Sequence, residues 1–359
     1  MQRTLLQISL GPVEESIPLW RGLQETFVLD ELEPGSFDLM ALVYRRLSAG
    51  EYDDPVVQRA KGIYRREWVR ANLLAEHTKE IAATLREAGI RALYVEGSPL
   101  ADRFYPERGL RPSWFVDVLV DEQASVTARD VLAGAGWTTP AGPVADPGDP
   151  VALNHADRTV CVLRSSLSYD FVMPEDPASS NGPLWESARP FALDGAEIPV
   201  PGPTETLLAV CTSGARVKPT ASVQWIVDAV MIIRSDEVDF ERLAELARAR
   251  GQTLRVREVL SYLSTLPETS IPAPVLARLD AAAVSPRERL AYALAARSLR
   301  AGGSLPEHAA RHLAAASNRS LPGAVVTFPE YLRRRWGLSH TWELPYAAGR
   351  RIARRRRAS

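Results

Sequence analysis

The spacing of apolar and polar positions predicts two helical regions on either side of a short α/β segment. Before residue 89, apolar residues recur at helical spacing in 12–28, 37–47 and 54–88. The longest of these stretches starts at Asp54-Pro55, a typical N-terminal signal of a helix, and ends before a glycine. In the second half of the chain, the same spacing returns in 204–211, 223–233, 240–250, 256–266 and 287–299.

The segment between the helical regions has the pattern of a small mixed sheet. Residues 91–95 and 115–120 are apolar and strand-like, and a glycine-serine turn and a short helical turn separate them. Residues 151–172 resemble further strands joined by tight turns. We therefore expect an α+β protein that is mostly helical, with a central small mixed β-sheet domain flanked by N- and C-terminal helical regions. The expected division is a helical region at 1–89, an α/β domain at 90–200, a helical region at 201–330 and a basic tail at 331–359.

One acidic residue in the strand RPSWFVDVLV, residues 111–120, needs an explanation. Asp117 stands among apolar residues whose pattern is typical of a strand buried on both faces. A carboxylate in such a place costs several kcal/mol of desolvation unless another group compensates its charge. Two interpretations are open. Asp117 is either structural, with backbone amides or Arg111 as its partner, or functional.

Composition and charge exclude several classes of protein. The chain has 359 residues, of which 46% are hydrophobic, so it can bury a sizeable core. The net charge of −1 excludes a global field that would attract nucleic acid or a membrane surface. Cys161 and Cys211 are the two cysteines, and both stand in apolar runs, which indicates a reducing compartment. No apolar run is long enough for a membrane span or a signal peptide, so we expect a cytoplasmic protein.

Three short motifs stand in order around Asp117: Val95-Glu96-Gly97, then Tyr105-Pro106, then Arg111 and the strand itself. This order resembles the minimal nucleotidyltransferases of the DNA polymerase β superfamily, in which a glycine turn precedes a strand with Asp-x-Asp. The closer resemblance is to uncharacterised bacterial nucleotidyltransferases, whose motifs are Leu-Lys-Gly, Tyr-Pro and Arg-x-x-x-Asp-Ile-Asp-Leu-Leu-Val. The resemblance extends over about residues 5–300 and includes Leu184-Trp185-Glu186 and Trp225-Ile226-Val227-Asp228.

The resemblance implies a site for two Mg²⁺ ions and a nucleoside triphosphate. In this superfamily the glycine turn contacts the triphosphate, and acids from neighbouring strands hold the metal ions. Glu96, Gly97 and Ser98 are then the nucleotide-binding residues, and Asp117 stands at the second Asp position. This chain departs from the family at two places, because Phe115 replaces the first Asp and Glu96 replaces the lysine.

The position of the third acid stays open. One alignment places the family's Asp-Leu-His-Trp on residues 162–165 and leaves no acid there, whereas another places it on residues 170–173. We favour the second, because residues 164–166 fit a hairpin turn and Asp170 is otherwise an unexplained acid in an apolar strand. Asp117 and Asp170 are therefore the candidate catalytic residues and metal ligands.

The replacement of the first Asp predicts impaired or lost two-metal catalysis, since a phenyl ring cannot bind Mg²⁺. The chain would then be a binding or accessory protein without a cofactor, and the resemblance implies a role in bacterial natural-product biosynthesis. The alternative is an active enzyme that uses Mg²⁺ to transfer a nucleoside monophosphate from a nucleoside triphosphate to a small-molecule or peptide acceptor. The expected partners are a nucleotide, such an acceptor, or a partner protein.

Further residues have a structural and a functional interpretation. Residues 331–359 contain nine Arg and one Glu, and we favour a solvated tail over a contact with nucleic acid or an acidic partner. His308 and His312 have a spacing that suits zinc but lack a further ligand nearby, so we expect an exposed helix face. We also expect His77 on a solvated face of its long helix, and Asp228 in the core.

Overall fold

The computed structural model describes most of the chain up to residue 286. The described residues there are 1–139, 150–165, 177–214 and 223–286. Beyond them it describes 288–289, 292–293, 308–309, 312, 321–336 and 338–350. Asp170 and most of the helix expected at 287–299 therefore lie outside the described residues.

The N-terminal region is helical, as predicted, and it begins with one helix more than expected. The helices are α1 (Gln2–Leu10), α2 (Val13–Gln24), η1 (Leu29–Glu31), α3 (Pro34–Phe37), α4 (Met40–Ala49) and α5 (Pro55–Glu87). Asp54 caps α5, because its carboxylate accepts a hydrogen bond from the backbone N–H of Val57 at 2.7 Å. This cap fixes the start of the helix that later covers the sheet.

A four-stranded mixed sheet carries the candidate site. Its strands are β1 (Ala92–Tyr94), β2 (Phe115–Val120), β3 (Val151–Asn154) and β4 (Val160–Arg164). Their spatial order is β1-β2-β4-β3, with β2 and β4 parallel and the other neighbours antiparallel. The helices of this segment are α6 (Ser98–Phe104), η2 (Arg108–Leu110), η3 (Glu122–Ala124) and α7 (Ser125–Gly134).

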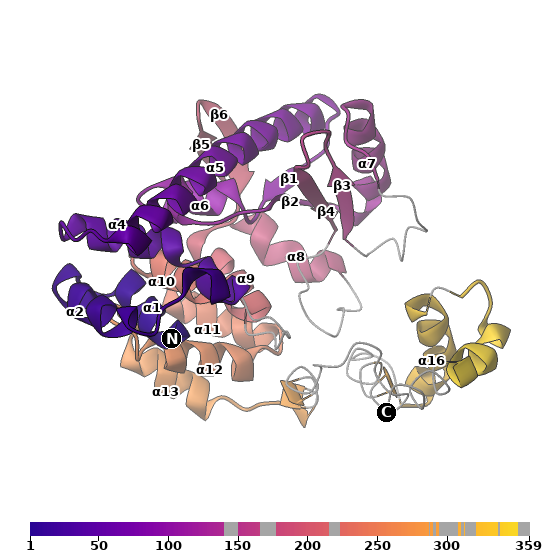
Figure 1. The fold of residues 1–359 in the computed structure, drawn as a ribbon. Coiled ribbons are helices and arrows are strands. Elements are labelled where there is room, and N and C mark those ends of the chain that lie inside the picture. The colour runs from indigo at the N-terminus through magenta and orange to yellow at the C-terminus, as the bar shows by residue number, and fades with distance from the viewer. Residues whose placement is uncertain are drawn as a thin grey trace.

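The two faces of the sheet pack against different helices. Val116, Val118 and Val120 share a hydrophobic cluster with residues of α5 and α7. On the opposite face, Leu119 packs with Leu184 of α8 (Pro177–Glu186). Figure 1 shows α5 and α8 on opposite sides of the strands. Because side chains alternate along a strand, Asp117 lies on the α8 side of β2.

A second, two-stranded sheet follows α8 and was not predicted. It consists of β5 (Arg189–Leu193) and β6 (Ala196–Val200), which pair antiparallel. Asp194 and Gly195 form the turn, and both have positive φ angles, of 45° and 83°. Two such residues in succession match the twist of the flanking strands, so this turn favours a tight hairpin.

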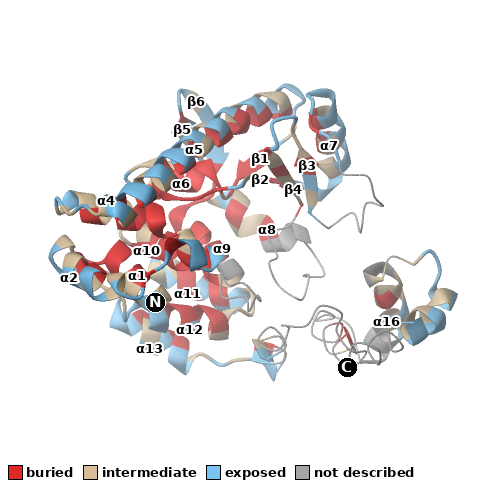
Figure 2. Ribbon diagram, in the orientation of Figure 1, coloured by how far each residue is buried: buried red, intermediate tan, exposed pale blue. Residues whose placement is uncertain are grey.

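The C-terminal helices share a hydrophobic core with the N-terminal ones. They are α9 (Pro203–Gly214), α10 (Gln224–Ile233), α11 (Phe240–Ala249), α12 (Thr253–Leu263) and α13 (Ala273–Ala281), followed by α16 (Leu321–Arg335) and η4 (Thr341–Glu343). Buried residues of α1, α4 and α9–α13 form one cluster, and the buried faces of these helices meet in Figure 2. The protein is thus mostly helical with a small mixed sheet, which confirms the predicted fold class. No helix in the described part is both long and apolar enough to cross a membrane.

Candidate functional site

The glycine turn between β1 and α6 lies directly against β2. Gly97 has φ 81° and ψ −133°, a conformation that residues with a Cβ atom rarely adopt. A Cβ atom at Gly97 would lie 2.8 Å from the carbonyl oxygen of Phe115. The N–H of Val95 donates a hydrogen bond to the carbonyl oxygen of Asp117 at 3.2 Å. The turn and the strand of Asp117 are therefore neighbours, as the resemblance implied.

The residues on either side of Gly97 differ in how far solvent reaches them. Ser98 is 3% exposed, and its hydroxyl has no hydrogen-bond partner within the described part of the chain. Glu96 is partly exposed. Glu96 is therefore the more accessible of these two side chains.

Asp117 is fully buried and forms an ion pair with an arginine of the neighbouring strand. In the register of β2 and β4, the residue opposite Asp117 is Val162. Arg164 lies two residues further along β4 and on the same face. Its Nε donates to Asp117 Oδ1 at 2.6 Å, and its side chain is 11% exposed. Arg164 therefore compensates the charge of Asp117.

Arg111, which we considered as the partner of Asp117, binds Asp228 of α10 instead. Its Nε and Nη2 donate to the two carboxylate oxygens of Asp228 at 2.8 and 2.9 Å. The hydroxyl of Tyr105 donates to Asp228 at 2.5 Å, and all three side chains are buried. Burial raises the pKa of Tyr105, and the charge of Asp228 raises it further. This network ties α10 to the segment before β2 and confirms the core position of Asp228.

The structure describes only one of the two positions considered for the third acid. Residues 162–164 of the first alignment form the end of β4, beside Asp117, and Ser165 follows the strand. Ser165 is buried there, and its carbonyl accepts a hydrogen bond from Asn181 at 2.6 Å. Asp170, the acid of the second alignment, lies outside the described residues, so its role as a catalytic residue and metal ligand stays a prediction. The other residues on the Asp117 face of β2 and β4 are Phe115, Leu119, Val160, Val162 and Arg164.

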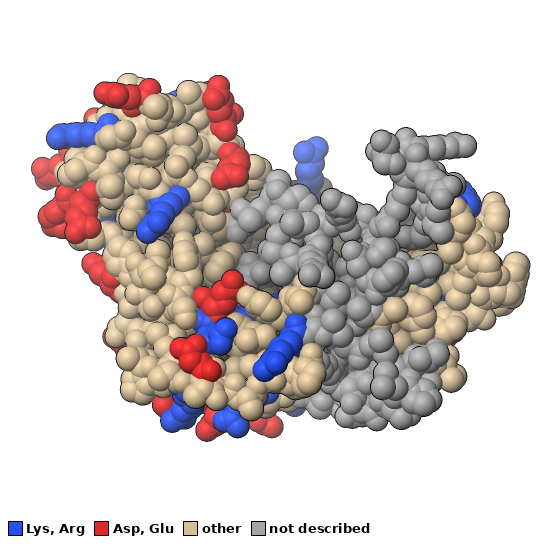
Figure 3. Space-filling view, turned by 90° about the horizontal axis from the view of Figure 1, so that it is seen from below, with Lys and Arg blue, Asp and Glu red and all other residues tan. Residues whose placement is uncertain are grey.

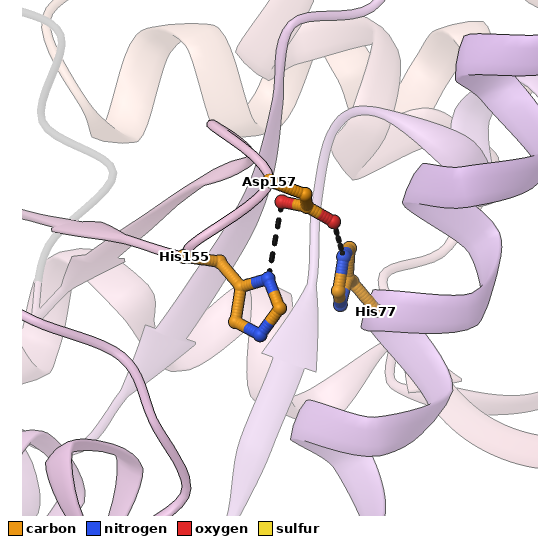
Figure 4. Close-up of side chains that lie close together, drawn as sticks. All are labelled: His77, His155 and Asp157. Atoms are coloured by element: carbon orange, nitrogen blue, oxygen red, sulfur yellow. Dashed lines mark hydrogen bonds and ion pairs between the residues drawn. The ribbon is translucent and has the colours of Figure 1, made fainter.

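A cluster that the sequence did not reveal connects α5 to the turn between β3 and β4 (Figure 4). His77 was expected on a solvated face, which is wrong, because it is 5% exposed. Its Nε2 lies 2.6 Å from Asp157 Oδ2 and its Nδ1 lies 2.9 Å from Glu80 Oε2. Burial lowers the pKa of His77, but the hydrogen bonds with Asp157 and Glu80 outweigh burial and leave the pKa above its usual value. The signal in the sequence is His155-Ala156-Asp157, two polar metal-ligand types in a turn between strands.

The expectation that His308 and His312 lie on an exposed helix face is also wrong. They are 3% and 9% exposed, and both rings contact Tyr331 of α16. The centroid of the Tyr331 ring lies 6.2 Å from that of His308 and 5.0 Å from that of His312. His312 Nε2 lies 3.0 Å from the hydroxyl of Thr327. Within the described residues, neither histidine belongs to a group of three metal-ligand side chains.

Part of the basic tail is described and has partners within the chain. Arg333 forms an ion pair with Glu330 at 2.6 Å, and the ring of Trp336 packs against His308. Acidic and basic side chains are interspersed over the described part of the face in Figure 3. Residues 351–359 lie outside the described residues, so both interpretations of the tail stay predictions.

Comparisons with known proteins give one family match over most of the chain and a remote structural match. A family model described as "uncharacterised nucleotidyltransferase" matches residues 38–267, which is more than half of the chain. A solved structure of an antigenic nucleotidyltransferase-like protein from Paracoccidioides brasiliensis is 14% identical, with a TM-score of 0.35. That match covers 55% of this chain and 94% of the other. No curated protein matches the sequence.

Proposed function

Because the chain belongs to the family of uncharacterised nucleotidyltransferases, we propose that it keeps the fold of these proteins but has impaired or lost two-metal catalysis. We further propose that it works as a binding or accessory protein, in a bacterial biosynthetic pathway. The observation that carries the proposal is the ion pair between Asp117 and Arg164.

The described residues around Asp117 do not fit a pair of Mg²⁺ ions. Magnesium needs several oxygen ligands in near-octahedral geometry, and two metal ions need a shared carboxylate. Phe115 stands where the first Asp is expected, and Val162 stands opposite Asp117. The guanidinium of Arg164 contacts the remaining carboxylate, and a guanidinium keeps its positive charge at all physiological pH values. A metal ion would have to displace this cation.

The glycine turn has the close approach to β2 that we expect of a nucleotide site, but the residue before the glycine has the opposite charge from that in the family. Gly97 still approaches β2 closely, which is the feature that requires glycine. Glu96, in place of the family's lysine, puts a negative charge beside the position of a triphosphate. These features support a binding partner other than a magnesium–triphosphate complex, and a small molecule, a peptide or a protein remain the proposed classes.

A transfer assay tests this proposal. The wild type is incubated with α-labelled nucleoside triphosphates and Mg²⁺, and the protein itself and peptide pools serve as acceptors. Both pyrophosphate release and label transfer are measured. Asp117→Asn is the test variant, and Asp121→Asn is the matched control, because Asp121 is an exposed acid just after the same strand. We expect the wild type and both variants to give the same background signal.

Magnesium-dependent turnover in the wild type would contradict the proposal if Asp117→Asn abolishes it and Asp121→Asn does not. In that case the chain is an active nucleotidyltransferase, and Asp170→Asn then tests whether Asp170 is its second metal ligand. Circular dichroism of each variant verifies that a lost signal is not due to unfolding.

A further inference from the structure

Three potential metal ligands from two separate elements meet at one edge of the sheet. His77 comes from the C-terminal half of α5, whereas His155 and Asp157 come from the turn between β3 and β4 (Figure 4). His155 Nδ1 lies 3.0 Å from Asp157 Oδ1, and His77 Nε2 lies 2.6 Å from Asp157 Oδ2. One ligand atom from each residue lies within 4.8 Å of the others. We propose that these three residues bind a zinc-type divalent metal ion that ties α5 to the β3–β4 turn.

The neighbours of the cluster orient its ligands. Glu80 lies one turn further along α5, and its carboxylate is 2.9 Å from His77 Nδ1. A carboxylate on the far nitrogen of an imidazole leaves the other nitrogen as the metal ligand, which is the usual arrangement behind metal-bound histidines. The N–H of Thr159 donates to Asp157 Oδ1 at 2.9 Å and so fixes the orientation of that carboxylate. The ligand groups are therefore held in place before any metal ion binds.

The charges around His77 also favour a cation. Two carboxylates, Glu80 and Asp157, flank its imidazole, and His155 contacts Asp157 from the other side. A divalent ion between His77, His155 and Asp157 would compensate both carboxylate charges and would leave each histidine as a neutral ligand.

The donor set selects the kind of metal ion. Two imidazole nitrogens and one carboxylate suit zinc and its neighbours among the transition metals, whereas Mg²⁺ and Ca²⁺ prefer oxygen ligands alone. His77 is buried, His155 is partly exposed and Asp157 is exposed, so a fourth ligand such as water can enter from the solvent side. In a tetrahedral zinc site, ligand atoms are about 3.3 Å apart. The present contacts of 2.6 and 3.0 Å, which involve different oxygens of Asp157, and the outer limit of 4.8 Å among the ligand atoms bracket this spacing.

The site is distinct from the one around Asp117. Helix α5 packs on the Val116 and Val118 face of the sheet, whereas Asp117 lies on the opposite face. Trp137 closes the cluster on one side, with its ring centroid 5.4 Å from that of His77 and 5.2 Å from that of His155. A metal ion here would stabilise the packing of α5 against the sheet, whether or not the protein transfers nucleotides.

Metal binding is tested with the full-length chain, purified without a polyhistidine tag and dialysed against a chelator. Zinc content is measured after reconstitution with Zn²⁺, and Co²⁺ serves as a spectroscopic probe because its visible bands report four-coordinate geometry. The test variants are His155→Ala and Asp157→Asn, and His340→Ala is the control because His340 is exposed and remote in sequence. We expect one zinc ion per chain in the wild type and the control, and a large loss in both test variants.

Two further measurements separate a metal site from a hydrogen-bonded cluster. Glu80→Gln, a change of a largely exposed side chain, is expected to weaken zinc affinity by about 10–100-fold, because Glu80 orients His77. Saturating zinc is expected to raise the thermal unfolding midpoint of the wild type by a few degrees and to leave that of His155→Ala unchanged. The proposal is overturned if the wild type retains no zinc and gives no four-coordinate Co²⁺ spectrum. It is equally overturned if folded His155→Ala and Asp157→Asn bind zinc as the wild type does.

Discussion

Arg164 Nε lies 2.6 Å from Asp117 Oδ1, and the two side chains form a buried ion pair between parallel strands β2 and β4. The pair stands where the resemblance implies a group of metal-binding acids. The guanidinium of Arg164 compensates the charge of a carboxylate that would be costly to bury alone. Arg164 thus gives Asp117 a structural partner in this fold.

Removal of Arg164 alone should destabilise the protein strongly. Arg164→Met leaves Asp117 buried without its guanidinium partner, and we expect the free energy of unfolding to fall by about 3–5 kcal/mol. The double variant Asp117→Leu with Arg164→Met removes both charges and should be much closer to the wild type. Urea unfolding followed by circular dichroism measures four proteins: the wild type, Arg164→Met, Asp117→Leu and the double variant. If the double variant is as unstable as the sum of the two single variants, the ion pair is not what stabilises this position.

The bidentate ion pair of Arg111 and Asp228 should stabilise the folded protein, because it holds α10 against the segment before β2. Asp228→Asn leaves the buried guanidinium of Arg111 without its counter-charge, so we expect a loss of about 3–5 kcal/mol in the free energy of unfolding. Glu237→Gln is the control, because the pair of Glu237 and Arg189 is exposed and should contribute less than about 1 kcal/mol. Equal effects of the two substitutions would contradict the assignment of Arg111 and Asp228 as a core contact.

A side chain at position 97 should destabilise the protein for two reasons, the positive φ angle and the close contact with β2. A comparison with Gly89, which has only the positive φ angle, separates the two effects. Gly97→Ala places a Cβ atom 2.8 Å from the Phe115 carbonyl oxygen at a φ of 81°, and we expect it to destabilise by about 3 kcal/mol. Gly89 also has a positive φ, of 70°, but a Cβ atom there would have no neighbour within 4 Å. Gly89→Ala should therefore lower the free energy of unfolding by only about 1 kcal/mol, because the positive φ angle is its only cost. Similar losses in the two variants, measured by urea unfolding, would show that the close approach of Gly97 to β2 is unimportant.

The spacing of apolar residues was sufficient to predict the strands and helices in which that spacing is regular. The strand of Asp117, the glycine turn before it and helices α5 and α9–α12 follow from local periodicity, and the structure places them as predicted. The hairpin of β5 and β6 was missed although Asp194-Gly195 is a strong turn signal, because Pro190 and Pro199 in the flanking strands weaken the strand pattern. Local rules therefore gave the fold class but not every strand.

The partners of the charged residues depend on tertiary contacts that no local rule provides. Arg164 meets Asp117 only because β4 lies parallel to β2 in one particular register. His77 lies three residues after Leu74 and four before Ile81, which are buried in α5, and its partner Asp157 comes from the β3–β4 turn, about 80 residues later. The sequence could identify Asp117 as a residue that needs a partner, but the identity of that partner required the sheet.

The contact between Arg108 and Asp194 should make stability depend on pH in the acid range. Arg108 donates hydrogen bonds to both carboxylate oxygens of Asp194 at 2.7 Å, and these bonds hold the pKa of Asp194 below its usual value. A lowered pKa in the folded state means that the unfolded chain binds the proton more readily. The contribution of the contact is therefore complete above the unfolded-state pKa, about 4, and is lost as the pH falls through the folded-state pKa.

A double-mutant cycle with Asp194→Asn and Arg108→Met isolates this contact. Asparagine tolerates the positive φ of the hairpin turn, so Asp194→Asn removes the charge without disturbing the turn. Because the side chain of Asp194 is 39% exposed, we expect a coupling energy of at most about 1 kcal/mol near neutral pH. The coupling should be smaller when urea unfolding is repeated at acidic pH, because protonation of Asp194 in the folded protein removes its charge. A coupling energy that stays constant between the two pH values would show that the contact does not depend on the charge of Asp194, and that the hairpin is held against Arg108 by the turn geometry alone.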